Sequence, residues 1–181
     1  MKDRTACFTG HRYQALSCLN LTDEEIDVRM YHLAQHAIRH LHEKYGITRF
    51  ISGMAIGFDQ AAAEAVLDYK ISYPEIELIS ARPFPSQHIK WPQHLRDRYF
   101  KILGEADDIV DVNSDPYAAW KMHARNAWMV DNSSVLIEFL LPDVTIGGTF
   151  SCHTYAVRKG LAIYNINPIT QESTFTRNSP E

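Results

Sequence analysis

A strand, a glycine turn and a helix follow one another between residues 48 and 69, and this order constrains the fold more than any other stretch. Residues 48–52 are typical of a short buried strand, Gly53 and Gly57 indicate a tight turn, and the alanine-rich run after Asp59 favours a helix. Backbone N–H groups at such a helix start bind anions, and glycine lets a ligand approach the backbone closely. We therefore interpret Ser52–Asp59 as an anion-binding turn. Two simpler interpretations stay open: the glycines serve only the turn geometry, and Asp59 is the N-cap of the helix.

The same alternation of strand-like and helical patterns extends over the rest of the chain. The expected strands cover about 4–9, 48–52, 76–81, 108–112, 135–140 and 161–166. Between them we expect a helix from the capping box of Thr22 and Glu25 to Gly46, one ended by Gly104, and one begun by Asp115-Pro116. Six strands and five helices in alternation predict an α/β fold with a doubly wound, mostly parallel sheet. Residues 1–166 form one expected domain, and 167–181 an expected polar, peripheral tail.

The unusual loops of this pattern all follow strands. They are Gly10-His11-Arg12, Ser52–Asp59, residues 82–88 and Gly147-Gly148-Thr149. In a doubly wound sheet, ligands bind outside the carboxyl ends of the strands. We therefore expect these loops to meet at one edge of the sheet and to form a binding site there.

Composition narrows the classes of protein that fit. The 181 residues are 45 % hydrophobic and 22 % charged, as in folded domains, and the net charge of −4 disfavours nucleic acid as a partner. The first residues lack the apolar run of a secretory signal, and no stretch of about 18 apolar residues predicts a membrane span. Three cysteines without CxxC spacing indicate reduced thiols. We expect a cytoplasmic protein.

Five short motifs, taken together in this order, resemble one family. They are Phe8–Arg12, Ser52–Asp59, Pro83–Gln87 with Trp91, Arg125-Asn126 with Met129–Asp131, and Gly147–Thr149. This set resembles the YpsA-like proteins, a family of unknown function in the SLOG superfamily, which includes the Lonely Guy phosphoribohydrolases and DNA-processing protein A. The resemblance covers roughly residues 4–166. It implies a Rossmann-like fold with a nucleotide-type ligand at the carboxyl ends of the strands.

The loops and motifs give the following candidate ligand-binding residues: Gly10, His11, Arg12, Ser52, Gly53, Gly57, Asp59, Arg82, Phe84, Gln87, Arg125, Asn126, Asp131, Gly147, Gly148 and Thr149. Arg12 is expected to pair with a phosphate, or else to form a surface ion pair. Phe84 and Gln87 are expected either to stack on a base and read its edge or to pack inward. Arg125 faces a phosphate or covers a helix surface.

The resemblance also bears on catalysis. The Lonely Guy enzymes cleave the N-glycosidic bond of nucleoside 5′-monophosphates with an arginine in Met-His-x-Arg and a glutamate three residues after a Gly-x-Gly-Thr turn. Met122–Arg125 is similar to the first motif, but the glutamate position is Cys152. Such a reaction needs a carboxylate near the sugar, and we do not expect Glu138 to replace it. We assign no catalytic residue.

We expect a protein that binds a nucleotide or nucleotide-derived ligand, of the nucleoside phosphate, NAD or ADP-ribose type, as a sensor or regulator. We expect this protein to need no cofactor. His32, His36 and His40 share a helix face but lack the spacing of a metal site.

Two alternatives to nucleotide binding stay open. They are hydrolysis of a nucleotide N-glycosidic bond and single-stranded nucleic-acid binding. A homodimer is possible through Tyr117, Trp120 and Trp128, although we expect these rings to be buried against the sheet.

Overall fold

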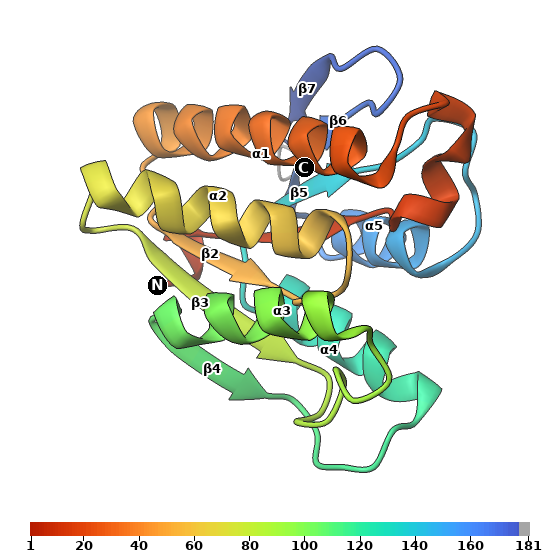
Figure 1. Ribbon diagram of the computed structural model, residues 1–181. Coiled ribbons are helices and arrows are strands. Elements are labelled where there is room, and N and C mark those ends of the chain that lie inside the picture. Colours follow the sequence, from red (N-terminus) through yellow and green to blue (C-terminus); the bar gives the residue numbers. More distant parts are fainter. Residues whose placement is uncertain (178–181) are drawn as a thin grey trace.

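The protein folds around a seven-stranded sheet, described by a computed structural model that covers residues 1–177 (Figure 1). The strand order is β4-β3-β2-β1-β5-β6-β7, and all neighbours pair in parallel except β6 and β7. The strands are β1 (Thr5–Gly10), β2 (Arg49–Ser52), β3 (Glu77–Arg82), β4 (Asp108–Asp111), β5 (Val135–Phe139), β6 (Ala162–Ile166) and β7 (Ser173–Thr176). The predicted doubly wound α/β fold is confirmed.

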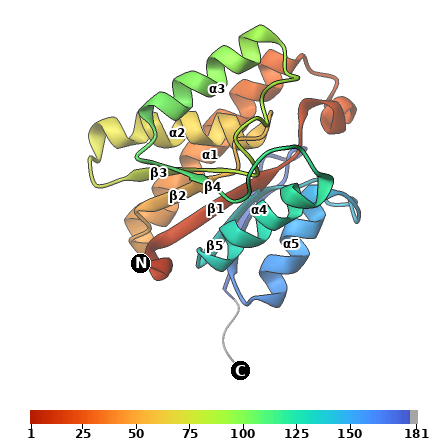
Figure 2. The same ribbon diagram turned by 90° about the horizontal axis from the view of Figure 1, so that it is seen from below.

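Helices cover both faces of the sheet. They are α1 (Asp23–Tyr45), α2 (Phe58–Ser72), α3 (Gln93–Glu105), α4 (Ala119–Asp131) and α5 (Gly148–Arg158), and the 3₁₀ helices η1 (Lys2–Arg4) and η2 (Tyr13–Leu19) complete the set. Figure 2 shows α1, α2 and α3 on one face and α4 and α5 on the other.

The alternation of side chains along the central strands builds a core on each face of the sheet. Phe8 and Phe50 point toward α1–α3, where their rings stack with centroids 5.9 Å apart. Cys7 and Ile51 point the other way and pack with residues of α4 and α5. These strands are buried on both faces, which explains the consecutive apolar residues Ala6-Cys7-Phe8 in β1 and Phe50-Ile51 in β2.

Helix α1 has the boundaries that its sequence signals predict. Thr22 Oγ1 accepts from the backbone N–H of Glu25, and the Glu25 carboxylate accepts from the backbone N–H of Thr22. Gly46 then ends the helix at φ 66°, in the left-handed region that glycine enters without strain.

The structure corrects three other predicted boundaries. Gly104 lies inside α3 and does not end it, and α4 begins at Ala119, after Asp115-Pro116. The Asp115 carboxylate caps no helix, because it accepts hydrogen bonds from the backbone N–H and hydroxyl of Ser86. Part of the expected peripheral tail forms β7, an antiparallel edge strand on β6. The rest of that prediction, at 178–181, lies outside the described residues.

Candidate functional site

The sheet has a topological switch point between β1 and β5. From β1 the chain winds outward through β2, β3 and β4, and it then crosses to the other side of β1 to continue as β5 and β6. The loops after β1 and β5 therefore leave in opposite directions and open a crevice at the carboxyl ends of the strands. A cleft of about 460 Å³ lies there, lined by Thr9, Gly10, His11, Arg12, Gln14, Ala15, Ala55, Asp59, Met122, His123, Arg125, Asn126, Gly148 and Thr149.

His11 joins the two sides of the switch point. Its backbone N–H donates to the carbonyl of Phe139 at 3.2 Å, and its Nε2 accepts from the backbone N–H of Leu141 at 3.1 Å. Because Nε2 accepts, the neutral ring carries its proton on Nδ1. Burial lowers the pKa of His11, which favours this neutral form. The ring therefore carries a neutral N–H donor, and His11 lines the cleft.

Arg12 supplies a cation at the mouth of the cleft. Its side chain is exposed, and among residues 1–177 it has no hydrogen-bond or ion-pair partner. The surface ion pair considered from the sequence is therefore absent from the described part of the chain. The guanidinium of Arg12 has five N–H donors in a fork that fits phosphate oxygens.

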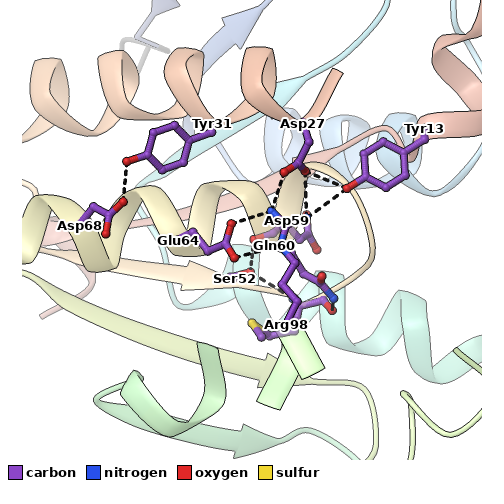
Figure 3. Close-up of polar contacts among 10 residues, drawn as sticks. Tyr13, Asp27, Tyr31, Ser52, Asp59, Gln60, Glu64, Asp68 and Arg98 are labelled. Carbon is purple, nitrogen blue, oxygen red and sulfur yellow. Dashed lines mark hydrogen bonds and ion pairs between the residues drawn. The ribbon is translucent and has the colours of Figure 1, made fainter. Parts of the chain in front are cut away.

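The segment after Arg12 is fixed by an ion-pair network between helices (Figure 3). Arg98 of α3 donates through Nη1 and Nη2 to Asp27 of α1, both at 2.9 Å, and through Nε and Nη2 to Glu64 of α2 at 3.0 and 2.6 Å. The hydroxyl of Tyr13, the first residue of η2, donates to Asp27 at 2.8 Å and accepts from Arg98 at 3.1 Å. Three helices therefore hold the chain next to Arg12.

The turn between β2 and α2 is stabilised by hydrogen bonds among its own residues. Ser52 Oγ donates to the carbonyl of Asp59 at 2.7 Å and accepts from the backbone N–H of Met54 at 3.1 Å, so its hydroxyl is used by the turn and not by the cleft. Gly57 has a φ of 99°, and a Cβ there would lie 2.8 Å from the carbonyl oxygen of His11. Gly57 is required both by its backbone conformation and by the close approach of the two loops.

Asp59 and Arg125 form the charged floor of the cleft, and both are more than 90 % buried. Arg125 donates through Nη1 to the carbonyl of Gly53 and through Nε to Asn126 Oδ1 at 2.9 Å. Asp59 Oδ2 lies 4.0 Å from Arg125 Nη1 and accepts from the backbone N–H of Ala55 at 3.4 Å. Helix α2 begins at Phe58 with Gly57 as N-cap, so the N-cap interpretation of Asp59 is wrong.

Burial disfavours both charges of this pair in the free protein. It raises the pKa of Asp59, against the opposing effect of Arg125, and it lowers the pKa of Arg125. Two of the five N–H groups of Arg125 are used by Gly53 and Asn126, and no hydrogen bond to the described residues uses the others.

The start of α5 brings a third group of donors to the cleft. Gly147 is its N-cap, with a φ of 99° and no capping side chain, and Gly148 and Thr149 line the cleft. Backbone N–H groups of the first helical turn have no partner within the helix. They therefore add donors and the positive end of the helix dipole to the two arginines.

Eight predicted site residues do not line this cleft. Ser52, Gly53, Gly57 and Gly147 lie in the turns beside it, and Arg82, Phe84, Gln87 and Asp131 lie elsewhere. Arg82 forms a bidentate ion pair with Asp111, with both distances 2.7 Å, and Asp131 accepts from Tyr155 and pairs with Lys159. Phe84 is 3 % exposed and Gln87 8 %, and both line a second pocket that adjoins the cleft.

The sequence reasoning missed several lining residues, among them Thr9, Gln14, Ala55, Met122 and His123. Met122 could have been predicted from helical spacing. It lies three residues before Arg125 and four before Asn126, so it shares their face of the helix. Ala55 lies within the Ser52–Asp59 turn that the sequence already indicates, whereas Gln14 had no such signal.

Two residues weighed for catalysis lie in the core. Cys152 is 2 % exposed, and burial raises its pKa to about 12. Glu138 is 1 % exposed, and its carboxylate lies 2.8 Å from His153 Nδ1 and accepts from Asn165 Nδ2 at 2.7 Å. Neither lines the cleft.

The aromatic residues around α4 differ from expectation. Tyr117 is 65 % exposed and Trp120 60 %, so the expected burial against the sheet is wrong for these two. Among residues 1–177, no helix is both long and apolar enough to cross a membrane.

Comparison with known proteins places the chain in a family. Residues 6–172 match the YpsA family, described as the YspA SLOG family. The uncharacterized SPbeta prophage-derived protein YoqJ of Bacillus subtilis is 32 % identical over 133 residues, which are 66 % of this chain and 77 % of YoqJ. A UPF0398 protein of Brevibacillus brevis is 29 % identical over 71 % of this chain and 68 % of its own.

Two solved structures share the fold. DNA processing protein A of Streptococcus pneumoniae superposes with a TM-score of 0.61 at 16 % identity, over 91 % of this chain but only 50 % of that one. The protein of the same name from Helicobacter pylori, described with a single-stranded DNA binding mode, gives 0.60 at 18 % identity, over 95 % and 69 %. With its family match over most of its length, the chain belongs to the YpsA family of the SLOG proteins.

Proposed function

We propose that this chain binds a nucleotide or nucleotide-derived ligand, of the nucleoside phosphate, NAD or ADP-ribose type, in the cleft at the β1–β5 switch point, as a sensor or regulator. The observation that carries the proposal is the convergence of Arg12, Arg125 and the start of α5 on one cleft. Each of these elements favours phosphate oxygens. Asp59 and the Nδ1–H of His11 add an acceptor and a donor that suit ribose hydroxyls.

A panel of nucleotides in a thermal-shift assay tests this function. A ligand at 100 times its dissociation constant adds about 2.7 kcal/mol to the free energy of unfolding. Arg12→Ala is the informative variant, because the side chain is exposed and its loss leaves the fold intact. We expect it to weaken binding at least about tenfold, since a charge-assisted hydrogen bond is lost.

The matched control is Arg39→Ala, which removes another exposed arginine, on α1 and outside the residues that line the cleft. It should bind like the wild type. A folded wild-type protein that no nucleotide shifts would refute the proposal.

A second candidate function is hydrolysis of the N-glycosidic bond of the bound nucleotide. The observation that favours it is Asp59, a carboxylate within the cleft, 4.0 Å from Arg125 Nη1. In such a reaction water adds to the anomeric carbon and the C–N bond breaks. Its electron pair leaves on the base nitrogen, and the base takes up the proton that the water gives up. Release of free base that Asp59→Asn abolishes would distinguish an enzyme from a sensor.

Binding of single-stranded DNA, the third candidate, rests on the Helicobacter pylori structure and on fold similarity alone. The net charge of −4 disfavours it.

A further inference from the structure

A second pocket of about 520 Å³ adjoins the cleft. Arg12, Ala55 and Met122 line both, so the two cavities share a wall. The character of the lining changes across this wall. The cleft is lined by charged groups and helix-start backbone, whereas Phe84, Trp91 and Tyr117 bring aromatic rings to the second pocket.

The walls of the second pocket are fixed before any ligand arrives. Asn113 Nδ2 donates to the carbonyl of Pro83 at 3.1 Å, and Asp115 accepts from the backbone N–H of Ser86 at 3.0 Å. Lys121, 7 % exposed, donates through Nζ to the carbonyls of Ser114 and Pro116 at 2.7 and 2.6 Å. The bonds of Asn113 and Asp115 join the loop after β3 to the segment before α4 that carries Tyr117, and Lys121 joins that segment to α4 itself.

Tyr117 presents a ring to this pocket. It meets the buried ring of Phe84 edge to face, with centroids 5.7 Å apart, and it is 65 % exposed. An exposed aromatic ring on a fixed backbone offers a stacking surface at little entropic cost. The arrangement suits a flat aromatic group.

Gln87 in the wall of the pocket has an unsatisfied acceptor. The residue is 8 % exposed, and its Nε2 donates to the hydroxyl of Tyr99 at 3.2 Å. Its Oε1 has no hydrogen-bond partner among the described residues and almost no exposed surface, so a ligand meets it only after the amide turns toward the pocket. A buried acceptor without a donor is costly, so a ligand that brings an N–H group to it gains affinity.

We propose that this pocket holds the base of the nucleotide and selects one with an exocyclic amino group, as in adenine. The base stacks against Tyr117 and directs its amino group to Gln87 Oε1. The ribose then lies at the shared wall, and the phosphate reaches the cleft between Arg12, Arg125 and the start of α5. This inference rests on the proposed function and adds the place and kind of the base.

Calorimetric titration with two probes tests the pocket. AMP carries base, ribose and phosphate, and ribose 5-phosphate lacks the base. Tyr117→Ala should weaken AMP roughly 5- to 100-fold, the effect of losing one stacked base, and leave ribose 5-phosphate unchanged. Arg12→Ala should weaken both probes. Trp120→Ala, which removes an equally exposed aromatic ring outside the pocket, is the matched control and should bind AMP like the wild type.

IMP tests the amino edge, because its carbonyl oxygen replaces the amino group of AMP and would face the Gln87 acceptor. We expect AMP to bind at least tenfold more tightly than IMP.

The outcomes separate the two proposals. If Tyr117→Ala binds AMP like the wild type, or weakens AMP and ribose 5-phosphate equally, the base lies elsewhere and the pocket assignment is overturned while the cleft stands. Equal affinity for AMP and IMP overturns the selection by Gln87. If no nucleotide and no ribose 5-phosphate binds to the folded wild type, the proposed function fails, and the base pocket with it.

Discussion

Gly53 lies directly beneath the Arg125 guanidinium. A Cβ at this position would overlap the Arg125 guanidinium and lie 2.7 Å from Asp59 Oδ2. Gly53→Ala should therefore displace the charged floor of the cleft. We expect a loss of about 1–3 kcal/mol in the free energy of unfolding, as for other overpacked sites, together with weaker nucleotide binding. Urea denaturation and the thermal-shift panel measure the two effects.

Gly104→Ala is the control for that substitution. A Cβ at Gly104 meets nothing within 4 Å, and the residue lies within α3. Alanine there should stabilise the protein by about 0.5–1 kcal/mol, the usual helix preference over glycine. A Gly53→Ala protein as stable as the wild type would contradict the tight contact with Arg125.

His11 should make stability depend on pH. Burial lowers its pKa in the folded state from the ordinary 6.5, so the unfolded chain binds more protons below that pH. The contribution of His11 to stability is therefore present above pH 6.5 and is lost as the pH falls through the lower folded value. His11→Gln keeps an acceptor for Leu141 without the titration. Between pH 7 and 5 the variant should lose less stability than the wild type, and identical slopes would refute the neutral, buried ring.

At the scale of elements, Arg98 connects α3 to α1, α2 and η2. Its side chain is 16 % exposed and its two carboxylate partners about 30 %. Arg98→Lys replaces a planar fork with one ammonium and cannot serve both carboxylates. We expect a loss of about 2 kcal/mol in the free energy of unfolding. Nucleotide binding should also weaken, because η2 begins directly after Arg12.

Arg49→Lys is the matched control for the network. Arg49 pairs through Nε with Glu77, and both residues lie at the amino ends of their strands, away from the cleft and the second pocket. Arg49→Lys should lower stability and leave nucleotide affinity unchanged. If Arg98→Lys also leaves affinity unchanged, the network does not position Arg12.

Elements with long or chemically distinct signals were predictable from the sequence. The capping box of Thr22 and the apolar run of β5 each act within one segment, and both are found where expected. β7 was missed because Phe175 is the one apolar residue in Ser-Thr-Phe-Thr. Asp115 was misread as an N-cap because its actual partner, Ser86, lies 29 residues earlier in the chain.

In the candidate site, too, some residues could be predicted from local patterns and others depend on distant partners. Arg12, the glycine turn and Gly148 follow strands, so the fold class alone brings them to one edge. Arg82 is the last residue of β3, and Asp111, its partner on the neighbouring strand β4, binds its side chain. Such pairings depend on register between strands, which no local pattern carries.

At the scale of the whole molecule, net charge and the number of cationic side chains distinguish a nucleotide site from a nucleic-acid interface. The net charge is −4, and the cleft offers two arginines. For single-stranded DNA the logarithm of affinity falls with the logarithm of salt concentration by about 0.7 for each phosphate contacted. Two contacts give a slope of about −1.4.

Titration of a labelled oligonucleotide at several salt concentrations measures this slope. We expect weak binding with a slope no steeper than that value. Tight binding with a slope several times steeper would reveal further cationic contacts and favour a DNA interface of the kind described for the Helicobacter pylori protein.

The strand order also sets when the site can exist during synthesis. β1 pairs on one side with β2, which follows within about forty residues, and on the other with β5, where Ala6 meets Val135. A ribosome that has released only the first four strands holds a chain with half of its sheet and no switch point. The cleft can form only once β5 has reached β1, where Phe139 and Leu141 contact His11, and the start of α5 has followed. Ligand binding therefore requires that β5 has paired with β1, and a chain stalled before β5 lacks the binding site.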